Sequence, residues 1–261
     1  HGRKWFVDGK VSKDSEWNYR SVSGVLPTWR WWQTSTGEKL RAEYDFTDAY
    51  NGGNSLKFSG DVAGKTDQDV RLYSTKLEVT EKTKLRVAHK GGKGSKVYMA
   101  FSTTPDYKFD AADAWKELTL SDNWTNEEFD LSSLAGKTIY AVKLFFEHEG
   151  AVKDYQFNLG QLTITDNHQA PQAPTSFSVV KQSLKNAQEA EAVVQFAGNQ
   201  DADFYEVYEK DGNNWRLLTG SSASTIYLPK VSRSANATGT TQELKVVAVG
   251  KNGLRSEAAT A

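Results

Sequence analysis

Alternation of apolar and polar residues constrains the fold of this chain more than any other feature. Val97, Met99 and Phe101 occupy every second position, so they fall on one face of an extended strand. Similar alternation recurs along Leu40–Phe46, Leu85–Val87, Tyr140–Phe146 and Tyr155–Leu159. Helical periodicity is scarce, and clusters such as Asn51-Gly52-Gly53-Asn54 supply turns between the runs. The sequence therefore predicts an all-β fold.

Two details of the pattern predict local structure. The apolar residues Tyr155, Phe157 and Leu159 change parity before Leu162, so we expect a β-bulge at Gly160. Residues Trp115–Leu120 are predicted to form a strand because Leu118 and Leu120 alternate with polar residues.

The chain is predicted to contain two domains. Residues 1–166 have the many half-polar strands of an antiparallel β-sandwich or jelly roll. Residues 167–173 lie in a polar, proline-containing stretch without periodicity and are interpreted as a linker. Residues 174–261 form a smaller, immunoglobulin-like sandwich whose strands we expect at Phe177–Val180, Ala192–Phe196, Phe204–Tyr208, Trp215–Thr219, Thr225–Leu228, Glu243–Val249 and Leu254–Ala258.

Composition excludes several classes of function. The formal net charge of −1, with both signs interspersed, argues against a nucleic acid or an anionic membrane as partner. No apolar stretch approaches the roughly 18 residues of a membrane span. The absence of Cys excludes disulfides and thiol catalysis. The opening HGRKWF has neither an initiator Met nor an apolar signal region, so we expect an excised fragment.

Several segments resemble known modules. The stretches DFYEVYEKDG and LKVVAVGKNGLRSEA resemble the third and the last two strands of a fibronectin type III domain, although Phe196 and Leu244 stand where Trp and Tyr are common. HGRKWFVDGK, LPTWRWW, FTDAYNGGNSLKFSGDV, WKELTLSDNW, FDLSSLAGKTIYAVKL and FNLGQLTITD resemble the galactose-binding-like, carbohydrate-binding-module-like jelly roll of family 85 endo-β-N-acetylglucosaminidases.

This resemblance implies an accessory, non-catalytic region of a secreted or cell-wall-attached bacterial hydrolase that acts on the chitobiose core of N-glycans. The implied partner is the catalytic TIM barrel of the same parent chain, which the region would pack against and whose glycan cleft it would support. Two alternatives remain open: an independent, lectin-like carbohydrate-binding module, and a surface adhesion or spacer protein.

No catalytic residue is predicted in this chain. The family uses a Glu and an Asn at the tips of barrel strands, whereas Asn126-Glu127-Glu128 is interpreted here as a solvated turn without a barrel. Glu147 and Glu149 are interpreted as surface charges. His89 and His148 each end an apolar face and are expected to be polar strand-end residues.

Aromatic residues are the best candidates for an interaction site. Sugar rings pack their C–H faces on aromatic rings, and neighbours such as Gln68, Asp69 and Arg71 would bond the hydroxyl groups. The candidates for carbohydrate binding or domain docking are Trp29, Trp31, Trp32, Arg71, Tyr107 and Trp124. Trp115 and Trp124 are also interpreted as core or interface residues, because Trp is highly buried on average.

A metal site is left open by the sequence. Related jelly rolls hold a structural calcium ion near an AYNGG-type turn, with a carboxylate from the last strand. Asp45 and Asp48 lie near that turn, but the last strand offers Gln161 rather than an acid.

Overall fold

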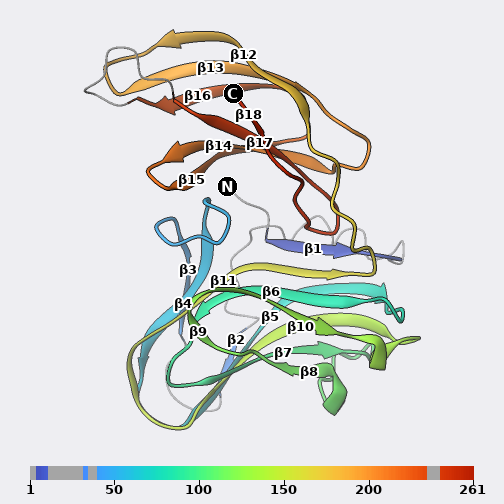
Figure 1. Cartoon of the computed structure of the whole chain (residues 1–261). Helices are drawn as coiled ribbons and strands as arrows, with labels where there is room; N and C mark the ends of the chain where they lie inside the picture. Colours follow the sequence, from blue (N-terminus) through green and yellow to red (C-terminus); the bar gives the residue numbers. More distant parts are fainter. Residues whose placement is uncertain (1–3, 11–31, 35–39, 234–241) are drawn as a thin grey trace. The chain divides into compact units, whose positions relative to one another are not determined.

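Strands account for nearly all of the regular structure. The computed structural model describes residues 4–10, 32–34 (backbone only), 40–233 and 242–261. Within these ranges the helical segments are two short 3₁₀ turns, Ala112–Ala114 and Ser132–Leu134. The predicted all-β fold class is therefore confirmed (Figure 1). No helix in the described ranges is long and apolar enough to cross a membrane.

Two compact units make up the chain, and they divide between Asn167 and His168. The first unit contains two antiparallel sheets. The larger sheet has the strand order β3 (Arg41–Asp45), β4 (Ser55–Val62), β11 (Val152–Thr165), β6 (Lys84–Gly91), β9 (Ser121–Asp130), and β1 (Trp5–Asp8) pairs in parallel with β11. The five-stranded sheet has the order β2 (Trp32–Thr34), β5 (Thr66–Glu78), β10 (Thr138–His148), β7 (Lys96–Ser102), β8 (Trp115–Glu117).

The core of the first unit follows from the alternation. Val97, Met99 and Phe101 are fully buried, as are Leu85 and Val87 on the other sheet. These residues belong to one apolar cluster, to which both sheets contribute side chains. The sandwich is thus held together by the faces that the sequence pattern predicted.

Bulges explain where the pattern shifts. The pairing of β11 with β6 shifts register between Leu159 and Gln161, so the bulge predicted at Gly160 is confirmed. A shift between Ile139 and Ala141 in β10 leaves Tyr140 on the opposite side from Val142, so its predicted place on the core face was wrong. The predicted place of Phe46 on the apolar face of its strand was also wrong, because Phe46 lies beyond the end of β3 and is 70% exposed.

The C-terminal half of β9 corrects a further interpretation. Asn126, Glu127 and Glu128 do not form a turn but pair with β6, with Asn126 opposite Ala88. The strand continues there because the backbone ladder to β6 extends across a mostly polar sequence. The predicted strand at Trp115–Leu120 is shorter, since β8 ends at Glu117.

The second unit has a three-stranded and a four-stranded sheet. Their orders are β12 (Thr175–Leu184), β13 (Glu189–Ala197), β16 (Thr225–Ser232), and β15 (Asn214–Ser221), β14 (Phe204–Asp211), β17 (Leu244–Val249), β18 (Ala259–Thr260). Phe196, Tyr205 and Val246 contribute to its own apolar core.

One predicted strand of the second unit was wrong. Residues Leu254–Ala258 make only an isolated bridge, between Val249 and Arg255. Ser256 there exchanges hydrogen bonds with the backbone of Ala248, with its Oγ accepting at 2.9 Å. This side-chain bond replaces the ladder, and the regular strand begins later, at Ala259.

Candidate functional site

The outer face of the five-stranded sheet carries aromatic rings, whereas the solvent-facing side of an antiparallel sheet usually carries polar side chains. Tyr98 of β7 lies opposite Phe145 of β10, and Trp115 of β8 pairs with the next outward position of β7. The three rings contact one another edge to face, with centroids 5.2–6.1 Å apart. We call this surface the aromatic face, and it comprises Asp69, Arg71, Tyr98, Tyr107, Phe109, Trp115, Lys143 and Phe145.

An ion pair lies among these rings. The Lys143 ammonium group is 2.8 Å from the Asp69 carboxylate, and their side chains are only 13% and 17% exposed. Its Nζ also lies 4.6 Å from the ring centroid of Phe109 and 4.8 Å from that of Trp115. The indole of Trp115 is fixed in turn by donating to the Phe109 carbonyl at 2.9 Å. The aromatic face therefore has an ordered ion pair at its centre and is not a purely apolar patch.

Arg71 and Tyr107 extend the aromatic face toward the loop after β7. The Arg71 guanidinium lies 4.5 Å from the Tyr107 ring centroid. Tyr107 is 39% exposed and has φ of +58°, a conformation that is unfavourable for a bulky side chain. Burial, reinforced by Glu117 and Glu147, raises the pKa of nearby Tyr98, so its hydroxyl stays protonated. Gln68 is not on this face: it is buried, and its Oε1 accepts from the Leu40 amide.

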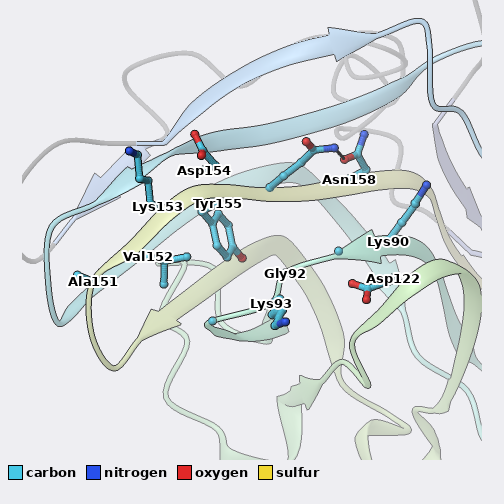
Figure 2. A pocket seen from close by; sticks show the side chains of 13 residues that line it. Lys90, Gly92, Lys93, Asp122, Ala151, Val152, Lys153, Asp154, Tyr155 and Asn158 are labelled. Atoms are coloured by element: carbon cyan, nitrogen blue, oxygen red, sulfur yellow. Dashed lines mark hydrogen bonds between the residues drawn. The ribbon is translucent and has the colours of Figure 1, made fainter.

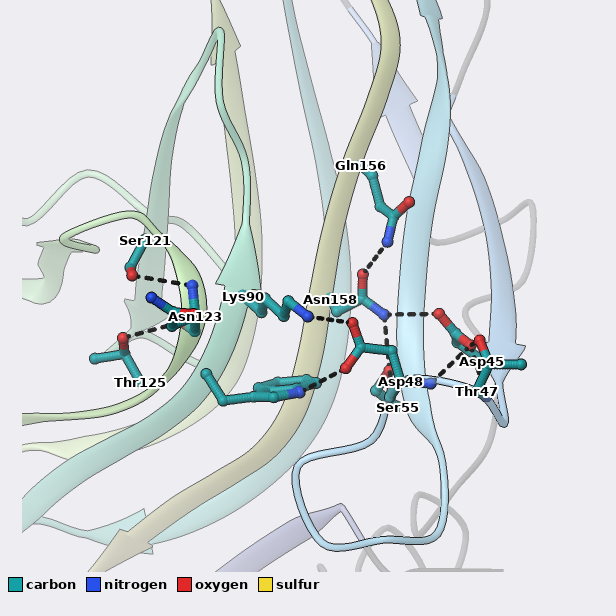
Figure 3. A network of polar contacts seen from close by, with 11 residues as sticks. Asp45, Thr47, Asp48, Ser55, Lys90, Ser121, Asn123, Thr125, Gln156 and Asn158 are labelled. Carbon is teal, nitrogen blue, oxygen red and sulfur yellow. Dashed lines mark hydrogen bonds and ion pairs between the residues drawn. The ribbon is translucent and has the colours of Figure 1, made fainter. Parts of the chain in front are cut away.

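A second polar site lies on the other sheet and contains Trp124. The Trp124 indole donates to Asp48 Oδ1 at 2.8 Å, and Lys90 donates to Asp48 Oδ2 at 2.5 Å (Figure 3). Asn158 of β11 donates to Asp45 Oδ2 at 3.2 Å and to Ser55 Oγ at 2.8 Å. The network thus fastens the segment that follows β3 to three strands of the sheet.

This donor set does not fit the calcium ion that the sequence left open. Asp45 Oδ1 accepts from the Thr47 amide and hydroxyl and from the Asp48 amide. These bonds and the one from Asn158 lower the pKa of Asp45, although its partial burial works in the opposite direction. Both Asp48 oxygens accept from N–H donors, and the Lys90 ammonium supplies the positive charge. Among the described residues, no group of three or more acidic, His or Cys side chains could hold a metal.

Two hollows lie beside this network along β11. One has a volume of about 640 Å³ and is lined by the Lys90–Gly94 turn, Asp122 and β11 (Figure 2). A neighbouring hollow of about 450 Å³ shares Asp154, Tyr155 and Gln156 with it. Asp154 has φ of +54° at a register shift of β11, which shapes the shared wall. Neither lining contains an exposed aromatic ring, so these hollows lack the stacking surface of a sugar site.

Two of the carboxylates considered for catalysis, Glu127 and Glu128, are occupied by ordinary partners. Glu128 bonds to Lys84 and Arg86, which lower its pKa, the reverse of what a general acid needs. Glu127 lies 2.9 Å from the Nε2 of His89 and accepts from the Thr119 amide.

The two histidines were misjudged from sequence. Both His89 and His148 are fully buried, whereas we expected polar strand-end residues. Each stacks on a core phenylalanine, His89 on Phe157 and His148 on Phe146. Alternation alone could have signalled this, because each His continues the inward parity of its strand.

The structure brings together only part of the predicted interaction set. Arg71 and Tyr107 are in contact, whereas Trp124 lies on the other sheet. Trp29 and Trp31 lie outside the described residues, and for Trp32 only the backbone, in β2, is described. Sequence reasoning missed Tyr98, Lys143 and Phe145. For Tyr98 and Phe145 a signal was present, because each is an aromatic residue at an outward position that a soluble surface would fill with a polar residue. Lys143 is an ordinary polar residue at such a position, so the pattern did not mark it.

Comparison with known proteins relates the chain to one group of glycoside hydrolases. A sequence model described as the C-terminal domain of GH85 endohexosaminidases matches residues 174–261. The crystal structure of the glycoside hydrolase domain of Endo-D from Streptococcus pneumoniae R6 is 92% identical, with a TM-score of 0.80. That match covers 100% of this chain but 41% of the other chain.

A more distant likeness concerns the fold alone. The crystal structure of a β-1,2-glucanase from Parabacteroides distasonis has 12% identity and a TM-score of 0.50, and covers 100% of this chain and 38% of that chain. No curated protein matches the chain significantly. Together with the all-β architecture, these two GH85 matches support an accessory C-terminal region of a GH85 endohexosaminidase.

Proposed function

We propose that this chain supports the catalytic domain of a parent endohexosaminidase that acts on the chitobiose core of N-glycans. The chain spans 41% of the length of the Endo-D structure that it matches, which leaves room for a catalytic domain elsewhere in such a protein. The name of the matching family model favours a position of that domain before the present residues. In this role the parent acts outside the cell, as a secreted or cell-wall-attached bacterial enzyme.

Strand β1 is the observation that carries this proposal. Trp5, Phe6 and Val7 are at most 3% exposed, and β1 pairs in parallel with the last residues of β11, from Trp5 opposite Leu162 to Asp8 opposite Thr165. The Leu162 amide donates to the Lys4 carbonyl at 2.8 Å, and the buried Lys4 ammonium donates to Asn54 Oδ1. A domain that precedes such a strand is tethered to the core of the sandwich and not to a free loop.

Uncoupling β1 in the parent enzyme tests the proposal. Phe6→Ala should lower the temperature at which the catalytic domain unfolds and should reduce N-glycan release, because the buried ring packs the tether into the sheet. Phe46→Ala is the matched control, since Phe46 is 70% exposed. Unfolding of the catalytic domain is followed by calorimetry, and glycan release by mass spectrometry. If the catalytic domain alone keeps full activity and its unfolding temperature, the chain is a spacer and the proposal fails.

A further inference from the structure

We infer that the aromatic face binds a neutral oligosaccharide. It lies on the five-stranded sheet, whereas β1 is part of the six-stranded sheet, so this inference and the proposed tether use different residues. Either can therefore fail without the other.

The ring arrangement offers a stacking platform. Tyr98, Trp115 and Phe145 are half-buried and hold one another edge to face, so their orientation is set before any ligand arrives. Tyr107 adds the most exposed ring of the set. A pyranose packs its apolar C–H face on such rings, and rings that are already ordered lose little side-chain entropy on binding.

Polar groups are interleaved with these rings. Asp69 and Lys143 form their ion pair among the aromatic side chains, and the Arg71 guanidinium lies against the Tyr107 ring. An apolar platform with a few oriented polar groups is the usual composition of a small-ligand site. A docked protein would instead select a broader apolar centre from which charges are depleted.

Charge balance indicates a neutral ligand. Three outward-facing rows of residues cross β5, β10 and β7. The first row contains Asp67, Glu147 and Lys96. The second row contains Asp69, and the third contains Arg71 and Lys143. Acidic and basic side chains are thus both present in these rows, three of each. An anionic sugar would lie close to a carboxylate whichever way round it sat on this face. The hydroxyl groups of a neutral sugar can instead donate to the acidic side chains and accept from the basic ones.

The backbone at Tyr107 is a second, independent indication. Its φ of +58° is held by a hydrogen bond from its amide to the Thr104 carbonyl at 3.0 Å. This backbone conformation is unfavourable for a residue that carries a Cβ atom. The loop nevertheless adopts this conformation, which places the Tyr107 ring against Arg71 at the edge of the platform.

Titration of the full 261-residue chain with chitotetraose, cellotetraose and Man₃GlcNAc₂ tests the inference. Saturation-transfer NMR should detect binding of at least one of these neutral probes. Tyr107→Ala should weaken that binding about tenfold, by loss of a stacking partner. Tyr107→Phe should retain most of it, because the ring remains. Tyr227→Ala is the control, since Tyr227 is also exposed, at 56%, but lies in the second unit.

Three outcomes overturn the inference. The first is that none of the neutral probes binds, or that only a sialylated glycan does. The second is that Tyr107→Ala and Tyr227→Ala weaken binding equally, which would place binding elsewhere. The third comes from hydrogen exchange in the sugar-free parent enzyme: if β7 and β10 gain protection from the catalytic domain, the aromatic face is a protein-docking surface.

Discussion

At the scale of single residues, His148 is the most unusual titratable group of the first unit. It is fully buried between Phe146 and Tyr155, with ring centroids 6.4 and 4.8 Å away. Neither of its ring nitrogens has a hydrogen-bond partner in the structure. Desolvation therefore lowers the pKa of His148 below its usual 6.5, with only a partial opposing effect from Asp67.

This burial predicts acid sensitivity. Because the pKa of His148 is lower in the folded chain, the unfolded chain binds the proton first as the pH falls below about 6.5. The free energy of unfolding should then decrease, and the loss should end once the pH passes the folded-state pKa. His148→Phe removes the proton site and should flatten this part of the profile. Urea unfolding at pH 8 and pH 5.5 measures it, and equal slopes in the two proteins would contradict the prediction.

Gly160 illustrates a different constraint, the close approach of aromatic side chains. A Cβ at this position would lie 2.6 Å from Cβ of Tyr50 and 2.9 Å from Cζ3 of Trp124. Gly160→Ala should therefore destabilise the first unit by about 1–3 kcal/mol through overpacking. Gly64→Ala is the matched control, because its Cβ would meet nothing within 4 Å. Thermal unfolding compares the variants, and the prediction is wrong if both melt together.

At the scale of elements, the network around Asp48 joins β6, β9 and β11 to the segment after β3. Lys90 and Asp48 are about one-third exposed, so their ion pair is partly screened by water. Lys90→Met should cost about 1 kcal/mol, because Asp48 loses its cationic partner while staying partly buried. Lys93→Met, on the neighbouring exposed turn, should cost much less.

The same network predicts indifference to calcium. Because Lys90 and Trp124 already satisfy the Asp48 oxygens, addition of EDTA should leave the unfolding temperature of the first unit unchanged. Differential scanning calorimetry with EDTA and with calcium checks this. A clear rise in the unfolding temperature with calcium would mean that Asp45 and Asp48 rearrange into a metal site.

At the scale of the whole molecule, the two apolar cores share no residue. The segment between them is fastened on the side of the second unit, where Asn252 and Asn199 donate to the carbonyls of Gln169 and Gln172. Each core is thus complete within its own unit, which is the condition for independent folding.

Separate expression of residues 1–166 and 174–261 tests this independence. Each piece should unfold cooperatively, because its core contains no residue of the other. The sum of the two calorimetric traces should reproduce the trace of the intact chain to within a few degrees. If either piece is unfolded alone, the predicted domain boundary is incorrect.

The sequence by itself determined the all-β class, the two sandwiches, most strand positions and the bulge at Gly160. These follow from local rules, because side chains of a strand alternate and the residues near a bulge carry the parity change themselves. The resemblance to GH85 modules could also be recognised in the sequence, since the motifs that carry it are continuous segments.

The tertiary structure decided which side chains meet. Arg71 and Tyr107 are far apart in sequence, and Lys143 reaches Asp69 only because β10 pairs with β5. Trp124 and Asp48 are also distant in sequence and meet only in the folded sheet. Their contact places a hydrogen-bond donor where the sequence left a calcium ion open. Burial of His148 likewise depends on the strand that packs over it. Strand pairing is a long-range property, so a pattern read along one strand fixes which face a residue takes but not its partner.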